Sequence, residues 1–372
     1  MFKIDITDNL SEKVLIGKRL VKLFDFDKVS EIKKTLDKVA PENIGKITVD
    51  LNDLIYLTIY DYWVYGVNST EELFYHFYEK THEEKKKYLT FLNRWEYLYH
   101  IQDRQYADLL ENKYEAYKLL MPYYKRDILK ISGEDDYTDF LDFVEKHTTF
   151  VVKPVDLSLA YGVHKESIFD HKDKQAFFKE LLNEGQMNKL SISTAKSSDI
   201  LLEEIIDQSD EMSKFHEASA NAVRITTVKV FGKVHVFYPW LKVGMNGDFA
   251  TCANRGSVLA GIDAETGVIN SNGKGEYLQE FAIHPNSGVV FKGFKIPDWQ
   301  DLVDLVKEMA LSLEQFNYVG WDMVHTKDKG WSVMEANWGG EFLGQLLQGK
   351  PLREEFETLI QYKSQREFWW KK

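Results

Sequence analysis

Three oxygen-bearing side chains near the end of the chain have the spacing of a metal site. In the segment YVGWDMVHTKDKGWSVMEANW, two apolar runs flank residues 327–330, which are rich in turn formers. If the runs pair as a hairpin about this turn, Asp322 and Glu335 become direct cross-strand partners. Asn337 then points to the same face as Glu335, because strand side chains alternate between two faces. The hairpin would therefore bring three oxygen ligands together.

Two carboxylates that face each other in a hairpin need a positive partner. Like charges repel across a strand pair, and the flanking Trp321, Met323 and Val333 indicate a largely buried hairpin. Oxygen ligands without His or Cys select Mg²⁺ or Mn²⁺ over zinc, and so few protein ligands leave room for phosphate oxygens and water. The pattern is that of a nucleotide-bound metal. The alternative is an edge hairpin whose acids are solvated.

A nucleotide would need an unusual phosphate site in this chain. The P-loop pattern G-x-x-x-x-G-K-[ST] is absent from the sequence, and no G-x-G-x-x-G follows a predicted strand. Lys153 ends the apolar strand FVVKP just before the loop VDLSLAYG, where a compact cation suits phosphate. The alternative is a solvated lysine at a strand end. Lys113, in LLENKYEAYKLL, is no more specific by itself, because surface lysines are common on helices.

Two further segments place charged residues inside apolar strands. In DILLEEIIDQSD, a buried Glu203 could accept the amino group of adenine while Asp210 takes a ribose hydroxyl. Alternatively, Glu203 and Glu204 form an exposed strand end. Arg224 lies within NAVRITTVKV, where an unpaired guanidinium would be costly. Its anionic partner is either a structural carboxylate or a transferred phosphoryl group.

The secondary-structure pattern changes near residue 130. Before it, apolar residues recur at helical spacing, as in TEELFYHFYEKTHEEKKKYLTFL, and only KITVDL suggests a strand. After the polar break SGEDDYTD, strands and helices alternate. We therefore expect an α+β protein whose residues 1–130 form a mainly helical N-terminal region.

Composition excludes several classes of protein. The 372 residues carry a formal net charge of -12, which argues against a protein that wraps nucleic acid. The start lacks a basic segment followed by an apolar one, and charged or polar residues interrupt every long apolar run, so we expect a cytoplasmic protein without a membrane span. The single cysteine, Cys252, excludes an internal disulfide and fits a reducing compartment.

The order of these features resembles the ATP-grasp superfamily: two lysines, the second before a loop, an E-E-x-I segment, an arginine strand and D…E-x-N. The segments SANAVRITT, HPNSGVVFKGFKIPDW and MEANW are similar to the sugar-transfer-associated ATP-grasp family, over about residues 61–356. The resemblance implies an ATP-grasp fold of two α+β subdomains that grip ATP, with a small lid subdomain over 131–206. A C-terminal subdomain with the metal site would span 207–372.

The resemblance also implies roles for particular residues. Those expected to contact ATP are Lys113, Lys153, Gly162, Glu203, Glu204, Ile206 and Asp210. Arg224 would approach the γ-phosphate, and Mg²⁺ (or Mn²⁺) would be bound by Asp322, Glu335 and Asn337. Two departures from the family concern the loop VDLSLAYGV, which keeps only Gly162, and the stretch GDFATCANRGSVLAGID, which lacks an Asp-Asn pair and a double glycine. Substrate choice is therefore the least transferable property.

The implied activity is that of an ATP-dependent carboxylate–amine ligase that forms an acylphosphate. Its substrates would be a small carboxylate and an amine or other nucleophile, such as an amino acid and a sugar-linked acceptor in polysaccharide biosynthesis or peptide modification. Arg255, Lys242 and His284 are candidates for binding the acceptor, with Arg255 first because its planar fork matches a carboxylate. His284 also fits a turn-stabilising role. The alternatives are a kinase on the same scaffold and a non-catalytic nucleotide-binding module.

Overall fold

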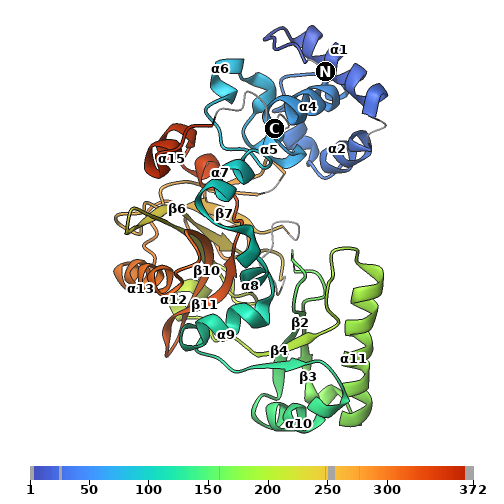
Figure 1. The fold of residues 1–372 in the computed structure, drawn as a ribbon, viewed down its shortest axis with the longest axis vertical. Coiled ribbons are helices and arrows are strands. Elements are labelled where there is room, and N and C mark those ends of the chain that lie inside the picture. Colours follow the sequence, from blue (N-terminus) through green and yellow to red (C-terminus); the bar gives the residue numbers. More distant parts are fainter. Residues whose placement is uncertain are drawn as a thin grey trace.

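The chain folds into an N-terminal helical region followed by two antiparallel sheets (Figure 1). The computed structural model describes residues 4–24, 27–158, 160–247, 249, 256–275 and 277–364. Along the longest axis, the first helices lie at one end, the large sheet in the middle and the small sheet at the other end. This arrangement confirms the expected α+β fold with a helical N-terminal region.

In the described residues, nine α-helices precede the first strand. They are α1 (Leu10–Phe24), α2 (Lys28–Leu36), α3 (Pro41–Ile44), α4 (Leu51–Tyr65), α5 (Ser69–Phe74), α6 (His82–Lys85), α7 (Arg94–Ile101), α8 (Asp108–Glu111) and α9 (Lys113–Tyr124), with short 3₁₀ turns η1 (Phe77–Glu79) and η2 (Arg104–Tyr106). Asp50 caps α4 by accepting hydrogen bonds from the backbone N–H groups of Asn52 and Asp53. In the described residues 46–51 no strand forms, so the strand expected at KITVDL is wrong: the segment leads into a helix cap and has no partner strand.

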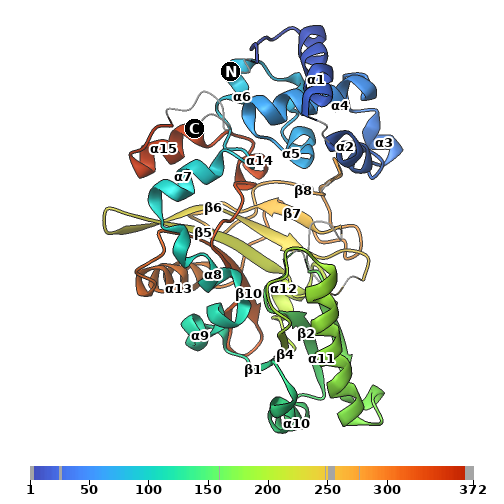
Figure 2. The same cartoon turned by 45° about the vertical axis from the view of Figure 1, so that its right-hand side comes forward.

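The small sheet contains four strands in the order β1-β4-β2-β3, and each neighbouring pair is antiparallel. Its elements are β1 (Ile128–Ile131), η3 (Glu134–Asp136), α10 (Tyr137–Lys146), β2 (Thr149–Pro154), β3 (His164–Ser167), η4 (Ile168–Asp170), α11 (Lys174–Ser191) and β4 (Ile200–Glu204). Every second residue of β2 is buried, and Phe150 and Val152 share a core with residues of α10 and α11. Figure 2 shows α11 running beside this sheet.

The large sheet contains seven strands in the order β11-β10-β5-β6-β7-β8-β9, again with antiparallel neighbours. Its strands are β5 (Ala222–Val230), β6 (Lys233–Val243), β7 (Val258–Gly261), β8 (Gly273–Lys274), β9 (Glu280–Phe281), β10 (Tyr318–Thr326) and β11 (Gly330–Asn337). The helices of this part are α12 (Asp210–Ser213), α13 (Trp299–Ser312), α14 (Gly344–Leu347) and α15 (Arg353–Ile360).

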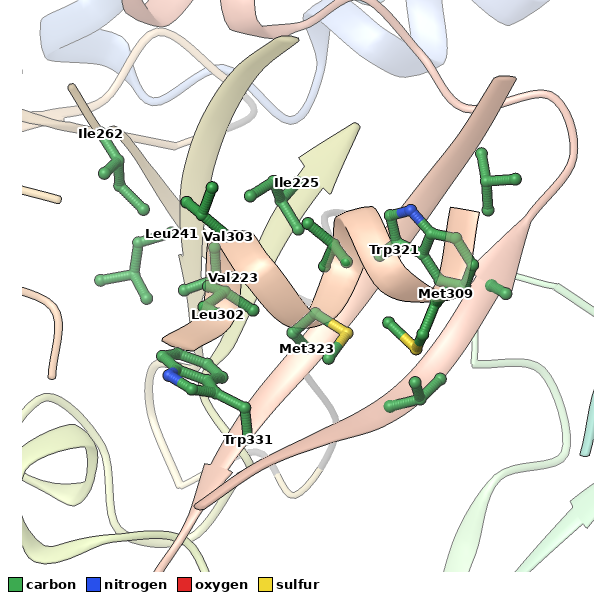
Figure 3. Close-up of a cluster of buried hydrophobic side chains, with 14 of the residues drawn as sticks. Val223, Ile225, Leu241, Ile262, Leu302, Val303, Met309, Trp321, Met323 and Trp331 are labelled. Atoms are coloured by element: carbon green, nitrogen blue, oxygen red, sulfur yellow. The ribbon is translucent and has the colours of Figure 1, made fainter. Parts of the chain in front are cut away.

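One core lies between the central strands of the large sheet and α13. Val223, Trp321 and Met323 from the strands share this cluster with Leu302 and Met309 from α13 (Figure 3). Burial of each such side chain contributes roughly 1.5–3 kcal/mol. The polar residues of β5, β6 and β10 described below are therefore attached to a rigid support. Within the described ranges, no helix combines the length and hydrophobicity needed to cross a membrane.

Candidate functional site

Asp322 and Glu335 face each other in the β10–β11 hairpin, as the predicted register requires. The ladder near the turn pairs Thr326 with Gly330 and Met323 with Val333. A β-bulge then shifts the register by one residue, so that Asp322 pairs with Glu335. Without this extra residue, Asp322 would pair with Met334, and the side chain of Glu335 would point to the other face of the sheet. The bulge therefore creates the facing acids.

Asp322 is bound by two cations. Its carboxylate accepts hydrogen bonds from Arg224 Nε at 2.5 Å and Nη2 at 3.0 Å, and Lys242 Nζ lies 3.2 Å from Oδ2. Arg224 and Asp322 are direct partners across β5 and β10. Burial favours the neutral acid, because Asp322 is only 1% exposed, but the charges of Arg224 and Lys242 outweigh it and hold the pKa of Asp322 well below its usual range. Of the two partners considered for Arg224, the structure contains the carboxylate.

Glu335 and Asn337 lie on the more open side of the same hairpin. The Glu335 side chain is 35% exposed, and its Oε1 lies 3.8 Å from Lys113 Nζ. Asn337 donates from Nδ2 to the carbonyl of Gly320 at 3.3 Å, which turns its Oδ1 acceptor away from that carbonyl. The predicted ligands thus differ in environment, with one buried and paired acid beside two accessible oxygen donors.

A second buried ion cluster lies at the junction of the two sheets. Glu203 forms ion pairs with Lys153 and with Arg126, whose Nη2 lies 3.1 Å from Oε2. Burial favours neutral Glu203, but the charges of Lys153 and Arg126 outweigh it and lower its pKa. Burial and the nearby Arg126 lower the pKa of Lys153, and Glu203 opposes that shift. Glu203 is buried, as one of the two interpretations assumed, and its carboxylate already has cationic partners.

Arg126 was not identified from the sequence, and it connects this cluster with the hairpin. Its guanidinium donates to the carbonyls of Val333 at 2.5 Å and Met334 at 3.3 Å, at the position of the bulge. In the sequence it is one of two adjacent basic residues in YYKRDILK, a pattern with no functional signature. Its importance follows from contacts with distant segments.

Lys113 adjoins both clusters and the loop after β2. Its backbone N–H donates to Val155 O at 2.8 Å, and its Nζ donates to Leu157 O. Its charge also acts on Lys153. Gly162, in the same loop, has a φ of +66°, and a Cβ there would lie 2.9 Å from Pro154 Cγ. Both the conformation and the close approach favour glycine.

The remaining candidates for nucleotide contacts follow β4. Glu204 Oε2 accepts a hydrogen bond from Asp127 N at 3.0 Å, and Ile206 lies partly buried in the connection that leaves the small sheet. Asp210 is exposed at the start of α12, 3.4 Å from Lys327 Nζ. Glu204 ends β4, and Ile206 and Asp210 lie in the connection from β4 to β5, which joins the two sheets.

His284 has the contacts of a structural residue. It is fully buried, its Nε2 lies 2.9 Å from Gly244 O, and its Nδ1 lies 3.0 Å from the hydroxyl of Ser287. Burial lowers the pKa of His284. Of its two interpretations, these contacts match the turn-stabilising one. Arg255 and Cys252 lie outside the described residues.

Two antiparallel sheets meet beside the facing acids and the partly buried Lys113 and Lys153, as expected for an ATP-grasp protein. The chain belongs to the sugar-transfer associated ATP-grasp family, whose family model matches residues 92–360. This confirms the resemblance drawn from the sequence motifs. No curated protein matches the sequence.

Several solved structures are similar to this chain. The ATP-grasp ligase PsnB complexed with minimal precursor is 13% identical, with a TM-score of 0.40, over 70% of this chain and 61% of that one. D-alanyl-alanine synthetase A from Vibrio cholerae is 10% identical, with a TM-score of 0.41, over 68% and 64%. An L-amino acid ligase from Bacillus licheniformis is 14% identical, with a TM-score of 0.38, over 66% and 44%. The chain thus spans less than two thirds of each of these proteins.

Proposed function

We propose that this protein is an ATP-dependent ligase that activates a carboxylate as an acylphosphate and transfers the acyl group to an amine. The observation that carries the proposal is the buried pair of Asp322 with Arg224 and Lys242, opposite the accessible Glu335. Fixed charges of both signs at one end of a rigid sheet suit a reaction in which charge develops on a phosphoryl group.

Asp322, Glu335 and Asn337 fit a divalent metal by their chemistry. A metal ligand must be deprotonated, and the lowered pKa of Asp322 meets this condition. Glu335 and Asn337 share a face of β11 and present oxygen atoms on its more open side. Three oxygen donors without nitrogen or sulfur favour Mg²⁺ or Mn²⁺. Mg²⁺ bound there would neutralise charge on the transferred phosphate.

The remaining residues would bind ATP and orient its phosphates. Lys113 and Lys153 place two cations beside the loop that contains Gly162, and Glu203 positions Lys153 through their ion pair. We assign the adenine and ribose contacts to the connection with Glu204, Ile206 and Asp210. Glu203 would therefore position Lys153, whereas the sequence led us to expect that Glu203 contacts adenine.

The chain's own contribution to the reaction would be positioning and electrostatics. Arg224 Nη1 also lies 3.8 Å from Glu341, so the guanidinium spans the space between Asp322 and the segment after Asn337. Arg224 and Lys242 would stabilise the oxygen atoms of the phosphoryl group, with Arg255 as a further candidate for the acceptor carboxylate. The family is described as associated with sugar transfer, and on this ground we extend the proposal to a role in sugar-linked polymers or peptides. The amine substrate follows from the ligase proposal.

An ADP-release screen tests this proposal. The purified protein would be incubated with ATP, Mg²⁺ and pairs drawn from amino acids, sugar acids and amines. We expect ADP and free phosphate in equal amounts, and only when both a carboxylate and an amine are present. A stable phosphorylated product without free phosphate would instead establish a kinase. No ADP in any mixture, together with no heat on adding ATP and Mg²⁺ in calorimetry, would refute every catalytic assignment.

Glu335→Gln tests the metal assignment. We expect turnover to fall by at least about 100-fold, because substitution of groups that merely support a metal ligand already costs 10–100-fold. Glu265→Gln is the matched control, since Glu265 is exposed in a turn far along the large sheet from the hairpin. Full turnover by Glu335→Gln would remove Glu335 from the metal site.

A further inference from the structure

Arg94, the first residue of α7, is a buried arginine with two side-chain donors that have no acceptor among the described residues. It is 5% exposed, and its Nε and Nη1 are buried without a hydrogen-bond partner. The guanidinium lies 4.7 Å from the ring centres of both Phe91 and Trp95. Aromatic faces stabilise the cation but accept none of its in-plane N–H bonds, and an unpaired buried charge is costly. The edge of the guanidinium therefore suits an anion that the described residues do not supply.

Arg94 lies beside the segment that follows the proposed metal ligand Asn337. Trp95 stacks on Trp338 with ring centres 5.9 Å apart, and a Cβ on Gly339 would lie 2.6 Å from the Trp95 ring. The close approach explains glycine at 339. It also shows that α7, from the helical region, packs directly against the end of β11.

The same segment connects Arg94 with Arg224. A Cβ on Gly340 would lie 3.5 Å from Arg224 Nη1, and the carbonyl of Gly340 accepts a hydrogen bond from the hydroxyl of Tyr318 at 3.0 Å. Burial raises the pKa of Tyr318, and the charges of Arg94 and Arg224 both oppose that rise, so both cations lie near it. Arg94 is thus a neighbour of the proposed reaction site and is not used in ATP binding.

Two acids, Glu71 and Glu341, lie near this site. Glu71 accepts hydrogen bonds from the N–H groups of Phe91 at 2.8 Å and Asn68 at 3.4 Å. Burial raises the pKa of Glu71 to about 8, and the charge of Arg94 opposes that rise. Glu341 is 44% exposed and pairs with Arg224. Within the described part of the chain, neither acid forms an ion pair with Arg94. Glu341 repels a ligand with several negative charges and attracts an ammonium group.

We propose that Arg94 binds the carboxylate of an amino-acid substrate, the amine component of the ligation, whose ammonium group faces Glu341. The proposal rests on the ligase function above. Arginine suits this role because its planar fork donates two parallel hydrogen bonds to a carboxylate. The ligand's carboxylate would supply the charge and the acceptors that the buried guanidinium lacks.

The first test is a binding measurement that needs no turnover. Protein labelled with ¹⁵N-arginine and saturated with ADP and Mg²⁺ would be titrated with the twenty common L-amino acids and D-alanine, and separately with their primary amides. The Nε–Hε signal of Arg94 is the one missing from Arg94→Lys. We expect it to shift with the free acids and not with the amides. No shift with any free acid, or equal shifts with the amides, would overturn the proposal.

The second test separates this proposal from the ligase function. For an amine substrate found in the ADP-release screen, we expect the primary amide to show a KM about 100-fold higher than the free acid, with kcat less affected, because the buried charge loses its partner. In Arg94→Lys, the KM for the free acid should approach that for the amide.

The two ideas can fail independently. ADP release at equal KM for acid and amide in the unmodified protein would overturn the Arg94 assignment and leave the ligase intact. An Arg94 signal that responds to free amino acids, without ADP release from any mixture, would support the binding site and refute the ligase. Because the comparison of acids with amides uses the unmodified protein, it stands even if the Arg94 variant fails to fold.

Discussion

Replacing Asp322 with asparagine should destabilise the large sheet measurably. Both carboxylate oxygens pair with Arg224 or Lys242, and Asp322 is 1% exposed. Loss of one partner from a buried ion pair costs about 3–5 kcal/mol, because the remaining charges stay desolvated. Arg224 keeps a contact of 3.8 Å with Glu341, and the Lys242 side chain is 15% exposed, so part of the charge is compensated. We therefore expect a loss near the lower limit, about 3 kcal/mol.

Native-state hydrogen exchange is the appropriate measurement for Asp322→Asn. The chain contains two sheets and a helical region, so one unfolding midpoint would not report on the large sheet alone. A loss of about 3 kcal/mol corresponds to roughly 100-fold lower protection of the amides in β5 and β10. Asp328→Asn is the matched control, because Asp328 is exposed in the turn of the same hairpin; we expect a change within about 0.5 kcal/mol.

The pH dependence provides an independent check on Asp322. Its pKa is lower in the folded than in the unfolded protein, so its stabilisation is present above the unfolded pKa and is lost as the pH falls through the folded one. The difference in amide protection between the unmodified protein and Asp322→Asn should stay constant from about pH 8 to 5 and shrink in acid below about pH 4. Equal protection at neutral pH would refute the buried ion cluster. A difference that grows in acid would refute the direction of the pKa shift.

Two further predictions concern the junction and the loop of the small sheet. Arg126→Leu leaves buried Glu203 with one cation fewer, so we expect the small sheet to lose about 3–5 kcal/mol of stability and ATP to bind more weakly in calorimetry. Unchanged stability together with unchanged ATP affinity would contradict the role of Arg126. Gly162→Ala should reduce protection of β2 and β3 amides by about 1–2 kcal/mol, because φ is +66° and Pro154 lies close. Gly247→Ala is the control, because Gly247 has a φ of +77° but no atom close to the position of an added Cβ. Equal losses of protection in the two variants would show that Pro154 contributes nothing to the effect at Gly162.

The sequence predicted the strands of the hairpin because local patterns determine them. Apolar residues flank a turn of Lys, Asp and Gly, which predicts the two strands. Counting residues about that turn also predicted that Asp322 faces Glu335, but in the structure this pairing depends on a β-bulge that no sequence pattern indicated. The strand predicted at KITVDL does not form, and the reason is not local. A strand needs a partner, and this segment instead supplies Asp50 as the cap of α4, whose apolar residues pack among helices.

The partners of the site residues were beyond the reach of sequence patterns. The sequence indicated that Arg224 needs an anion but left open whether a carboxylate or a phosphoryl group provides it. Arg126 and Arg94 gave no signal, because arginines beside a strand or at a helix start are common on protein surfaces. Arg126 became significant through contacts with a segment far away along the chain, such as the carbonyl of Val333. Arg94 became significant because two of its donors are buried without an acceptor.

The bulge in β11 makes the metal site and the junction of the sheets interdependent. The register shift brings Asp322 opposite Glu335, and the carbonyls of Val333 and Met334 at that bulge accept hydrogen bonds from Arg126. The guanidinium of Arg126 also pairs with Glu203 on β4 of the small sheet. A movement of the small sheet that displaces Arg126 must therefore break its bonds either to Glu203 or to the bulge. Because both sets of bonds are buried, the geometry of the facing acids is coupled to the position of the small sheet.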